Sequence, residues 1–317
     1  MTIKEILDLA ISKGINADFR RNKEITEAQK RIRVKYEKMN QQEKEEFDIE
    51  RLENPFSDTR LLFGQPHQKI KRILVGIDID GEELLLAKEL GGIDLIISHH
   101  PRGKALAGLD DVMQLQIDLF NIYGVPVNIA EKLLKKRIEE VSRSLAPVNH
   151  NRVVDIAKHL NIPLMSIHTP CDNMAARFVD NKLKKDKPLF VGDVLDSLRE
   201  IPEYREAISF GAGPRIFLGN KESRVGKIIT EMTGGTEGSS EIYEKLSQAG
   251  VGTVVGMHLS EQHRLEAEKA NINVIIAGHI SSDSIGMNLF LDWLEKRGIE
   301  ILSCSGLIRV SRIGNPL

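Results

Sequence analysis

The chain has 317 residues, and at roughly 150 residues per domain this length predicts about two domains. Its 44 Lys and Arg residues nearly cancel its 46 Asp and Glu residues, which excludes the general basic field of a non-specific DNA-binding protein. The two cysteines, Cys171 and Cys304, exclude a disulfide scaffold and a Cys-only zinc site. The sequence contains no apolar run of about 18 residues and no secretion signal, so we expect a cytoplasmic protein.

Residues 1–55 differ in composition from the rest of the chain. The beginning predicts one short amphipathic helix, and residues 22–53 are dense in both signs of charge with few apolar side chains. Pairs such as Glu27 with Arg31, four residues apart, favour helix there. We expect a solvated, charged helical extension, with an arm that binds a partner or nucleic acid as the alternative.

An α/β pattern begins after this extension. The first half, residues 56–180, opens with a strand at 73–77, a helix at 82–90 and a strand at 94–98, which is a parallel crossover unit. The pattern continues with helices at 111–123, 130–145 and 153–160, a strand or loop at 126–129, and a strand at 164–168. Residues 181–222 are expected to form a connecting region, in which a helix could begin near Val191.

The pattern restarts in the second half, residues 223–317. Strands are expected at 225–230, 251–256 and 274–277, and helices at 240–248, 261–270 and 281–297. The segments Ile96–His100 and Ile275–His279 are similar strand ends that both finish on histidine. We infer a weak internal duplication, which predicts an α/β fold of two similar halves with a site between them.

Histidines carry the strongest functional signal. Five of the nine, His99, His100, His168, His258 and His279, follow predicted strands directly. Open α/β sheets bind ligands at the carboxyl ends of their strands, where loops lie on a stiff scaffold. Neutral imidazole is a common ligand of zinc, iron, manganese and nickel, so these residues indicate a metal site.

Two of these histidine segments have metal-ligand spacing. Pro101 ends the strand before it, so His99 and His100 can face one site, although polar residues capping a strand end are the alternative. His279 and Asp283 are four residues apart at the start of a helix and share one face, although acidic residues are also common there because they favour the helix dipole.

A third segment, His168–Asn173, again places polar residues after a short strand. The two oxygens of Asp172 could bridge two cations, and His168 could orient Asp172 or a bound water. Cys171 could be a ligand, but a packed thiol is the expectation for a lone cysteine beside proline.

Two further segments could line the same pocket. His258 and Glu261 are candidates for catalytic or supporting roles, and His263 either lines the pocket or lies on the surface. A glycine-rich turn before the helix at 240–248 contains Gly234, Gly235 and Gly238, whose backbone N–H groups could hold a phosphate. The alternative is a tight strand-to-helix turn, since the turn lacks the lysine of a phosphate-binding loop.

Taken together, the motifs resemble one known family, the NGG-one-interacting-factor-three-like proteins. The resemblance rests on Ser98-His99-His100-Pro101, on His168-Thr169 with Asp172, and on Gly278-His279 with an acid four residues later, and it covers residues 61–317. It implies two divalent metal ions held by His99, His100, Asp172, His279 and Asp283. It also implies a ring-shaped homo-oligomer, commonly a homohexamer, and a GTP cyclohydrolase I type two activity.

The chain departs from the family pattern at two positions. The family usually has glutamate at the position of Asp283, and a shorter carboxylate would bridge metals with a different geometry. The family's Thr-Gly-Glu segment before a histidine is replaced by Val-Gly-Met-His, with His258 in place of the acid. The departure at Asp283 affects which metal the site prefers, and the departure at His258 affects the family's catalytic residues.

The function expected from these residues is a dinuclear metal-dependent hydrolase. Two cations bridged by Asp172 and Asp283 would lower the pKa of a shared water, and His258 or His168 could serve as acid or base. The resemblance makes a purine nucleotide the expected substrate, with a phosphoester as the alternative. A metal-binding oligomeric scaffold or a regulatory protein-binding module without catalysis is the alternative function.

Overall fold

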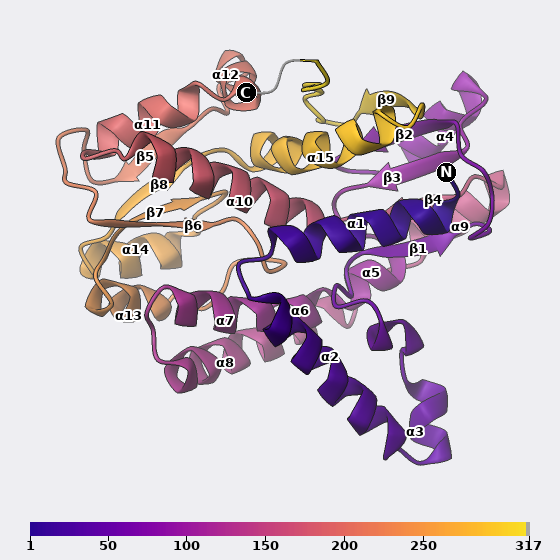
Figure 1. Cartoon of the computed structure of the whole chain (residues 1–317), viewed down its shortest axis with the longest axis horizontal. Helices are drawn as coiled ribbons and strands as arrows, with labels where there is room; N and C mark the ends of the chain where they lie inside the picture. Colours follow the sequence, from indigo (N-terminus) through magenta and orange to yellow (C-terminus); the bar gives the residue numbers. More distant parts are fainter. Residues whose placement is uncertain (315–317) are drawn as a thin grey trace.

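Two β-sheets lie at opposite ends of the molecule, and two long helices run between them (Figure 1). The computed structural model describes residues 1–314. The first sheet has the order β1-β4-β3-β2-β9, and the second has the order β5-β8-β7-β6. The strands of the first sheet are β1 (Arg60–Phe63), β2 (Arg72–Gly76), β3 (Leu95–Ser98), β4 (Leu164–Ser166) and β9 (Glu300–Cys304). Those of the second are β5 (Arg215–Leu218), β6 (Lys227–Glu231), β7 (Val251–Gly256) and β8 (Asn273–Ile276).

The two sheets share one topology. In each, an antiparallel edge strand comes first in the chain and pairs with the last of the three parallel strands that follow it: β1 with β4, and β5 with β8. The first sheet has a fourth parallel strand, β9, beside β2. The expected pair of similar α/β halves is therefore confirmed. The strand that ends at His99 and His100, however, is β3, and its topological counterpart is β7, which precedes His258. The strand before His279 is β8, which is the counterpart of β4. The segments Ile96–His100 and Ile275–His279, although similar in sequence, are therefore not equivalent in the fold.

The apolar faces of each sheet are covered by helices on both sides. Helices α4 (Gly81–Leu90) and α9 (Arg152–Leu160) pack on the outer face of the first sheet. The outer face of the second sheet is covered by α7 (Gln114–Ile122), α8 (Val127–Leu145), α13 (Ile242–Gln248) and α14 (Glu261–Lys269). Helices α11 (Val191–Arg199) and α12 (Pro202–Ser209) join the core on the inner face of this sheet. The short helices α5 (Gly103–Ala107) and α6 (Leu109–Val112) follow β3.

Helices α10 (Thr169–Asp186) and α15 (His279–Glu295) form the centre of the molecule. Side chains of both contribute to the inner cores of both sheets. The two helices approach closely where Gly286 faces the backbone of Cys171, because a Cβ at Gly286 would lie 2.1 Å from the Cys171 carbonyl oxygen. Only glycine permits this approach, which brings the N-terminal turns of the two helices together.

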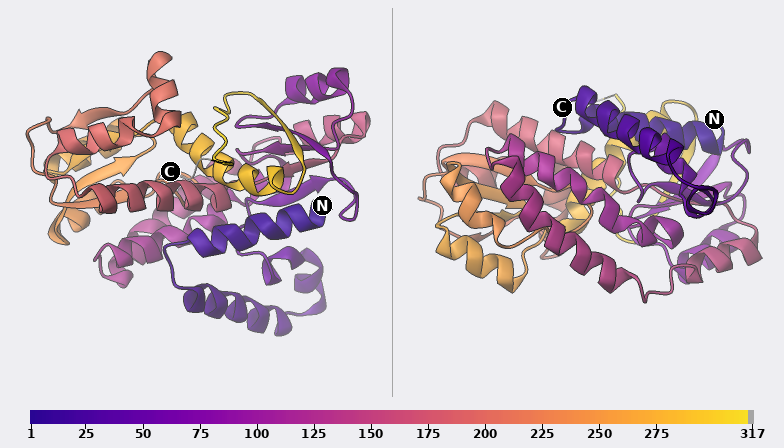
Figure 2. Two further views of the ribbon diagram at one scale, coloured as in Figure 1. Left: turned by 45° about the horizontal axis from the view of Figure 1, so that its top comes forward. Right: turned by 90° about the horizontal axis from the view of Figure 1, so that it is seen from below.

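The N-terminal segment is divided between core and surface. Helix α1 (Ile3–Ala17) begins with a capping box between Thr2 and Glu5 and packs Ile3, Ile6 and Ala10 into the core of the first sheet. These apolar residues recur at helical spacing, so residues 1–17 belong to the core rather than to an exposed extension. The charged helices α2 (Asn22–Glu37) and α3 (Gln41–Glu46), followed by a short 3-10 turn at Ile49–Leu52, project from the body (Figures 1 and 2).

Several elements differ from expectation for local reasons. The segment 126–129, expected as strand or loop, begins α8, because Pro126 is the N-cap and the buried face of α8 starts with Ala130. The region 181–222 is mainly helical and contains the end of α10, all of α11 and α12, and the edge strand β5. Among residues 1–314, no helix is both long and apolar enough to cross a membrane.

Candidate metal centre

The candidate site lies where three parallel strands end. His99 and His100 directly follow β3, and their backbone N–H groups donate to the carbonyls of Gly76 and Ile77 at 3.0 and 2.9 Å. His168 is the N-cap of α10 after β4, and His279 is the first residue of α15 after β8. Each strand therefore delivers its histidine to the edge at which helices α10 and α15 begin.

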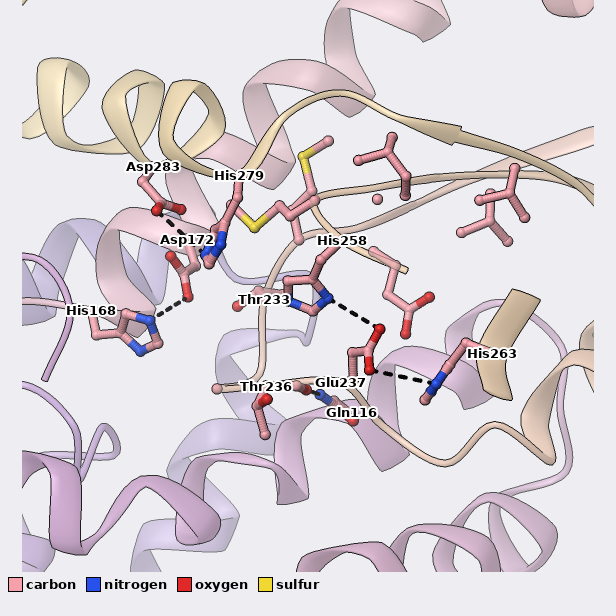
Figure 3. Close-up of a pocket in the computed structure, with 18 of the residues that line it drawn as sticks. Gln116, His168, Asp172, Thr233, Thr236, Glu237, His258, His263, His279 and Asp283 are labelled. Atoms are coloured by element: carbon pink, nitrogen blue, oxygen red, sulfur yellow. Dashed lines mark hydrogen bonds and ion pairs between the residues drawn. The ribbon is translucent and has the colours of Figure 1, made fainter. Parts of the chain in front are cut away.

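Two aspartates near the beginnings of these helices extend the cluster. Asp172 follows His168 by four residues, and their Oδ2 and Nε2 atoms are 3.7 Å apart. Asp283 follows His279 by four residues, and the corresponding atoms are 3.5 Å apart. Because β4 and β8 are topological counterparts, these two His–Asp pairs are equivalent in the two halves, and the site contains one pair from each half (Figure 3).

Each half's pair meets the His99 and His100 imidazoles. Nε2 of His99 lies 3.3 Å from Oδ1 of Asp172 and 3.5 Å from Oδ1 of Asp283. Nε2 of His100 lies 3.3 Å from Oδ2 of Asp283. The five residues proposed from sequence as metal ligands are thus brought together, and His168 lies beside them, with its ring 5.0 Å from that of His99.

The imidazoles are held from outside so that their Nε2 atoms face the cluster. Nδ1 of His99 donates to the Ile167 carbonyl at 3.1 Å, and Nδ1 of His100 donates to Asp78 at 2.8 Å. Nδ1 of His168 donates to the fully buried Asp58 at 2.9 Å. A hydrogen bond at Nδ1 fixes the tautomer that leaves Nε2 as a free electron pair, the arrangement found at metal-ligating histidines.

The atoms that face one another here lack ordinary partners. Nε2 of His99, Oδ1 of Asp172 and Oδ2 of Asp283 are buried and have no hydrogen-bond partner in the described part of the chain. Buried polar atoms are normally paired, so three orphaned atoms at one point fit the binding of a cation there. Their chemistry, imidazole nitrogen and carboxylate oxygen, suits a divalent transition metal.

The charged groups of this cluster lie close enough to shift one another's pKa values strongly. Burial lowers the pKa of His99, but the carboxylates of Asp283 and Asp172 outweigh it and raise the pKa well above its ordinary value. Burial raises the pKa of Asp283, but His99 and His100 outweigh it and hold the pKa well below its ordinary value. Without a metal ion, a proton shared among these groups would take over part of the neutralising role.

Three groups of residues have the geometry to hold an ion. Within each group the ligand atoms lie within 4.8 Å of one another. The groups are His99 with Asp172 and Asp283, His100 with His279 and Asp283, and His99 with His100 and His168. Asp283 belongs to two of them, with Oδ1 toward His99 and Oδ2 toward His100 and His279.

His258 adjoins this cluster but is held by a different acid. Its ring makes an edge contact with His279, with centroids 5.3 Å apart, and its Nδ1 lies 3.4 Å from Oε1 of Glu237 (Figure 3). Burial raises the pKa of Glu237, but the hydrogen bond from His258 outweighs it and lowers the pKa to about 2. The His258–Glu237 pair corresponds by topology to His100–Asp78 in the first half.

The other two candidates of this segment differ in position, and of the two only His263 lines the cavity. The side chain of Glu261 is 70% exposed and pairs with Arg264 on the surface of α14, so it does not line the pocket. His263 is buried: it accepts from the Ser260 hydroxyl at 2.7 Å and donates from Nε2 to the Gly238 carbonyl at 3.2 Å. Both of its nitrogens are engaged, which indicates that it anchors the loop before α13.

The glycine turn has a packing role that accounts for its residues. Gly234 and Gly235 have φ values of +97° and +88°, and a Cβ at either would lie within 3 Å of Gln116 or Val112. Gln116 clamps the turn by donating to the carbonyls of Gly234 and Thr236. Gly238 also packs against Gln116, with a Cβ distance of 2.6 Å. Phosphate binding by this turn stays a prediction.

Sequence reasoning missed the acids that hold the histidines from outside. Asp58 precedes β1 and accepts hydrogen bonds from His168 and Thr169. Asp78 follows the first parallel strand of the first half, and Glu237 lies in the loop after the corresponding strand β6. Position after a strand end is the signal that could have found them. No sequence feature links Asp58 to residues 110 positions away.

Comparisons with known proteins were made with the sequence and with the fold. No family model and no curated protein matches the sequence. Among solved structures, a NIF3 superfamily protein from Sphaerobacter thermophilus aligns over 96% of this chain and 98% of its own, with 25% identity and a TM-score of 0.75. Reduced HcgD from Methanocaldococcus jannaschii aligns over 77% of this chain and 87% of its own, with 16% identity and a TM-score of 0.50.

The first of these matches covers nearly the whole chain, whereas the second supports the fold alone. Together with the paired halves, the first match shows that the chain has the fold of a NIF3 superfamily protein.

Proposed function

We propose that the protein is a hydrolase with a dinuclear divalent metal centre held by His99, His100, Asp172, His279 and Asp283. The observation that carries the proposal is the convergence of three buried, unpartnered ligand atoms from His99, Asp172 and Asp283. Their burial makes a purely structural explanation costly, because each orphaned polar atom costs about 1–3 kcal/mol and a charged one more.

Two ions rather than one are supported by the position of Asp283. Its two oxygens face two different sets of imidazoles, and two of the possible ligand groups share this residue. A carboxylate placed in this way can bridge two cations, and Asp172 can add a further ligand to the cation beside His99.

The chemistry of such a centre is the activation of water, since divalent ions lower the pKa of a bound water toward neutrality. The residues of this chain add proton handling and access. His258 is partly exposed toward the cavity, and Glu237 holds its Nδ1, so its ring can pass a proton to a leaving group. His168 is buried and held by Asp58, which suits it to orienting Asp172.

A purine nucleotide is the substrate that we propose, in keeping with the family resemblance. The cavity beside the centre is lined by acidic and apolar side chains, without Lys or Arg among the described residues. A neighbouring cavity shares Glu237 and His263 with the first. It is lined by Lys136 and Arg137, by their ion-pair partners Glu241 and Glu140, and by Ser239 and Ser240. Those cationic and hydroxyl groups are suited to phosphates, so the two cavities together could hold a base and its phosphates.

The test combines metal analysis with turnover. Purified protein is expected to contain close to two metal ions per chain, and His99→Ala should lose at least one of them while His159→Ala, an exposed histidine on α9, keeps both. Hydrolysis of a panel of nucleotides with added manganese or zinc should fall at least about 100-fold in His99→Ala. If His99→Ala instead loses its fold or its assembly, and the wild type hydrolyses nothing, the metals have a structural role and the protein is a scaffold.

We further propose self-association as a homohexamer, which rests on the family resemblance. Light scattering of the wild-type protein checks this directly, since a hexamer of this 35.6 kDa chain is readily distinguished from a monomer or dimer. A monomer at micromolar concentration would contradict the proposal.

A further inference from the structure

The cavity beside the metal centre extends well beyond the proposed ligands. At one end it is lined by Asp172, His279 and Asp283, and at the other by side chains from the ends of β6 and β7 and from the loop after β6. Figure 3 shows Glu237, Thr236 and Gln116 on the side away from the proposed ligands. The mechanism above uses only the first end, so the chemistry of the far end remains to be explained.

Glu231 is a notable acceptor at the far end. It is the last residue of β6 and lines the cavity, and no described group donates a hydrogen bond to its carboxylate. Burial raises its pKa to about 7, although His258 opposes this and Glu237 adds to it. A carboxylate placed in this way favours the binding of a ligand that brings its own N–H donors.

A second unpartnered acceptor lies in the same wall. Gln116 is 2% exposed, and its Nε2 donates to the carbonyls of Gly234 and Thr236 at 2.9 and 2.6 Å. These two bonds fix the orientation of the amide, so its Oε1 is an acceptor, and that atom has no partner among the described residues. The wall therefore offers acceptors from two separate elements, α7 and β6, and its other carboxylate, Glu237, is already engaged by His258 and the Ser260 N–H.

Apolar side chains also line the far end, beside the hydroxyls of Thr233 and Thr236. Met232, Met257, Val254 and Ile276 line the cavity together with the aromatic ring of Tyr243. A flat ring could place its faces against these side chains and its edge against the acceptors, as small-molecule sites commonly combine apolar walls with a few placed polar groups.

We propose that the far end binds a planar nitrogen heterocycle whose edge presents a ring N–H beside an exocyclic amino group, as guanine does, and that Glu231 accepts from both. Such an edge matches the two oxygens of one carboxylate, and Gln116 Oε1 can accept from a further donor. The inference rests on the proposed function for the position of the heterocycle beside the metal centre, and it adds the residue that determines specificity. Adenine lacks the ring N–H, and hypoxanthine lacks the amino group.

Binding of nucleosides, measured by isothermal titration calorimetry on the metal-loaded protein, tests this without requiring turnover. Guanosine is expected to bind about 10- to 100-fold more tightly than inosine or adenosine, because a hydrogen bond to a charged group is lost with each analogue. Glu231→Gln should remove most of this preference, since an amide presents one acceptor and one donor to two donors. The matched control is Glu244→Gln, a change of an exposed glutamate on α13 that should keep the preference.

Two outcomes would overturn the inference. One is a wild-type protein that binds the three nucleosides equally or not at all, and the other is a Glu231→Gln variant that is folded and keeps the guanosine preference. Either result leaves the metal centre untouched, because metal content and turnover of other substrates are measured separately. Conversely, selective guanosine binding by a protein that hydrolyses nothing would sustain the inference and refute the proposed hydrolase.

Discussion

Asp172 and Asp283 approach the same atom, Nε2 of His99, from two different helices, at 3.3 and 3.5 Å. A neutral imidazole cannot satisfy both, because its only N–H is donated from Nδ1 to the Ile167 carbonyl. The three side chains are therefore stable together only when a cation lies among them, whether a proton or a metal ion. This relationship makes the folding of the protein dependent on the occupancy of its site.

Removal of metal is accordingly expected to destabilise the fold. A ligand present at about 1,000 times its dissociation constant adds about 4 kcal/mol to the free energy of unfolding, which corresponds to roughly 5–10 °C in melting temperature for a chain of this size. Thermal melts before and after treatment with a chelator, and again after adding back manganese or zinc, measure this. Asp283→Asn serves as the control, because a variant that cannot bridge the ions should respond much less; an unchanged melting temperature in the wild type would contradict the expectation.

Substitution of Asp58 should weaken both the fold and the site. Asp58→Asn replaces an acceptor of hydrogen bonds from His168 Nδ1 and the Thr169 hydroxyl with an amide that also carries donors, at a position with no solvent exposure. We expect a loss of about 2–4 kcal/mol in the free energy of unfolding by denaturant.

The control for this variant is Asp78→Asn. Asp78 makes a comparable bond to His100, but its side chain is 53% exposed, so the expected loss is below about 1 kcal/mol. Equal losses in the two variants would show that burial of Asp58 contributes nothing.

Stability should depend on pH through Glu231. The pKa of its carboxyl is raised from 4.5 to about 7 by burial, so the folded state holds a proton that the unfolded state releases. The resulting stabilisation is fully present below about pH 4.5 and is lost as the pH rises through about 7. Glu231→Gln should thus be neutral near pH 5 and stabilising by about 1–2 kcal/mol near pH 8, after allowance for partial exposure. Denaturant melts at the two pH values decide this, and a pH-independent difference would refute it.

The crossing of α10 and α15 can be tested at Gly286. Gly286→Ala places a Cβ 2.1 Å from the Cys171 carbonyl oxygen, so the helices must separate or the variant must unfold. We expect a loss of at least about 2–3 kcal/mol, together with reduced metal content because Asp172 and Asp283 move apart. As a comparison, Gly298→Ala meets no atom within 4 Å and should keep its metal, although its φ of +78° adds a small strain. Full metal retention in Gly286→Ala would show that the spacing of the two helices does not set the site.

Local pattern was sufficient for much of the fold and for the central part of the candidate site. The strands β3, β7 and β8 are nearly continuous apolar runs that are each followed within three residues by a histidine, and parallel strands place such ends at one edge. His279 and Asp283 were placed on one face by helical spacing, and the structure has them 3.5 Å apart. Local information determines these features because each depends on residues a few positions apart.

Other features depend on distant residues and were not predictable in this way. The edge strands β1, β5 and β9 are short, partly exposed and without regular alternation of apolar residues. Asp58 acquires its role only because β1 pairs with β4, which brings it to His168. The role of Gly286 likewise follows from a helix crossing that no spacing within the sequence indicates.

The pairing of β9 with β2 joins Arg72 to Glu300, residues 228 positions apart. During synthesis, β9 is made long after β2, so the first sheet stays incomplete until β9 can pair with β2. Until then, β2 is an unpaired, apolar edge strand. The N-terminal half should be the later of the two to become resistant to proteolysis, although it leaves the ribosome first.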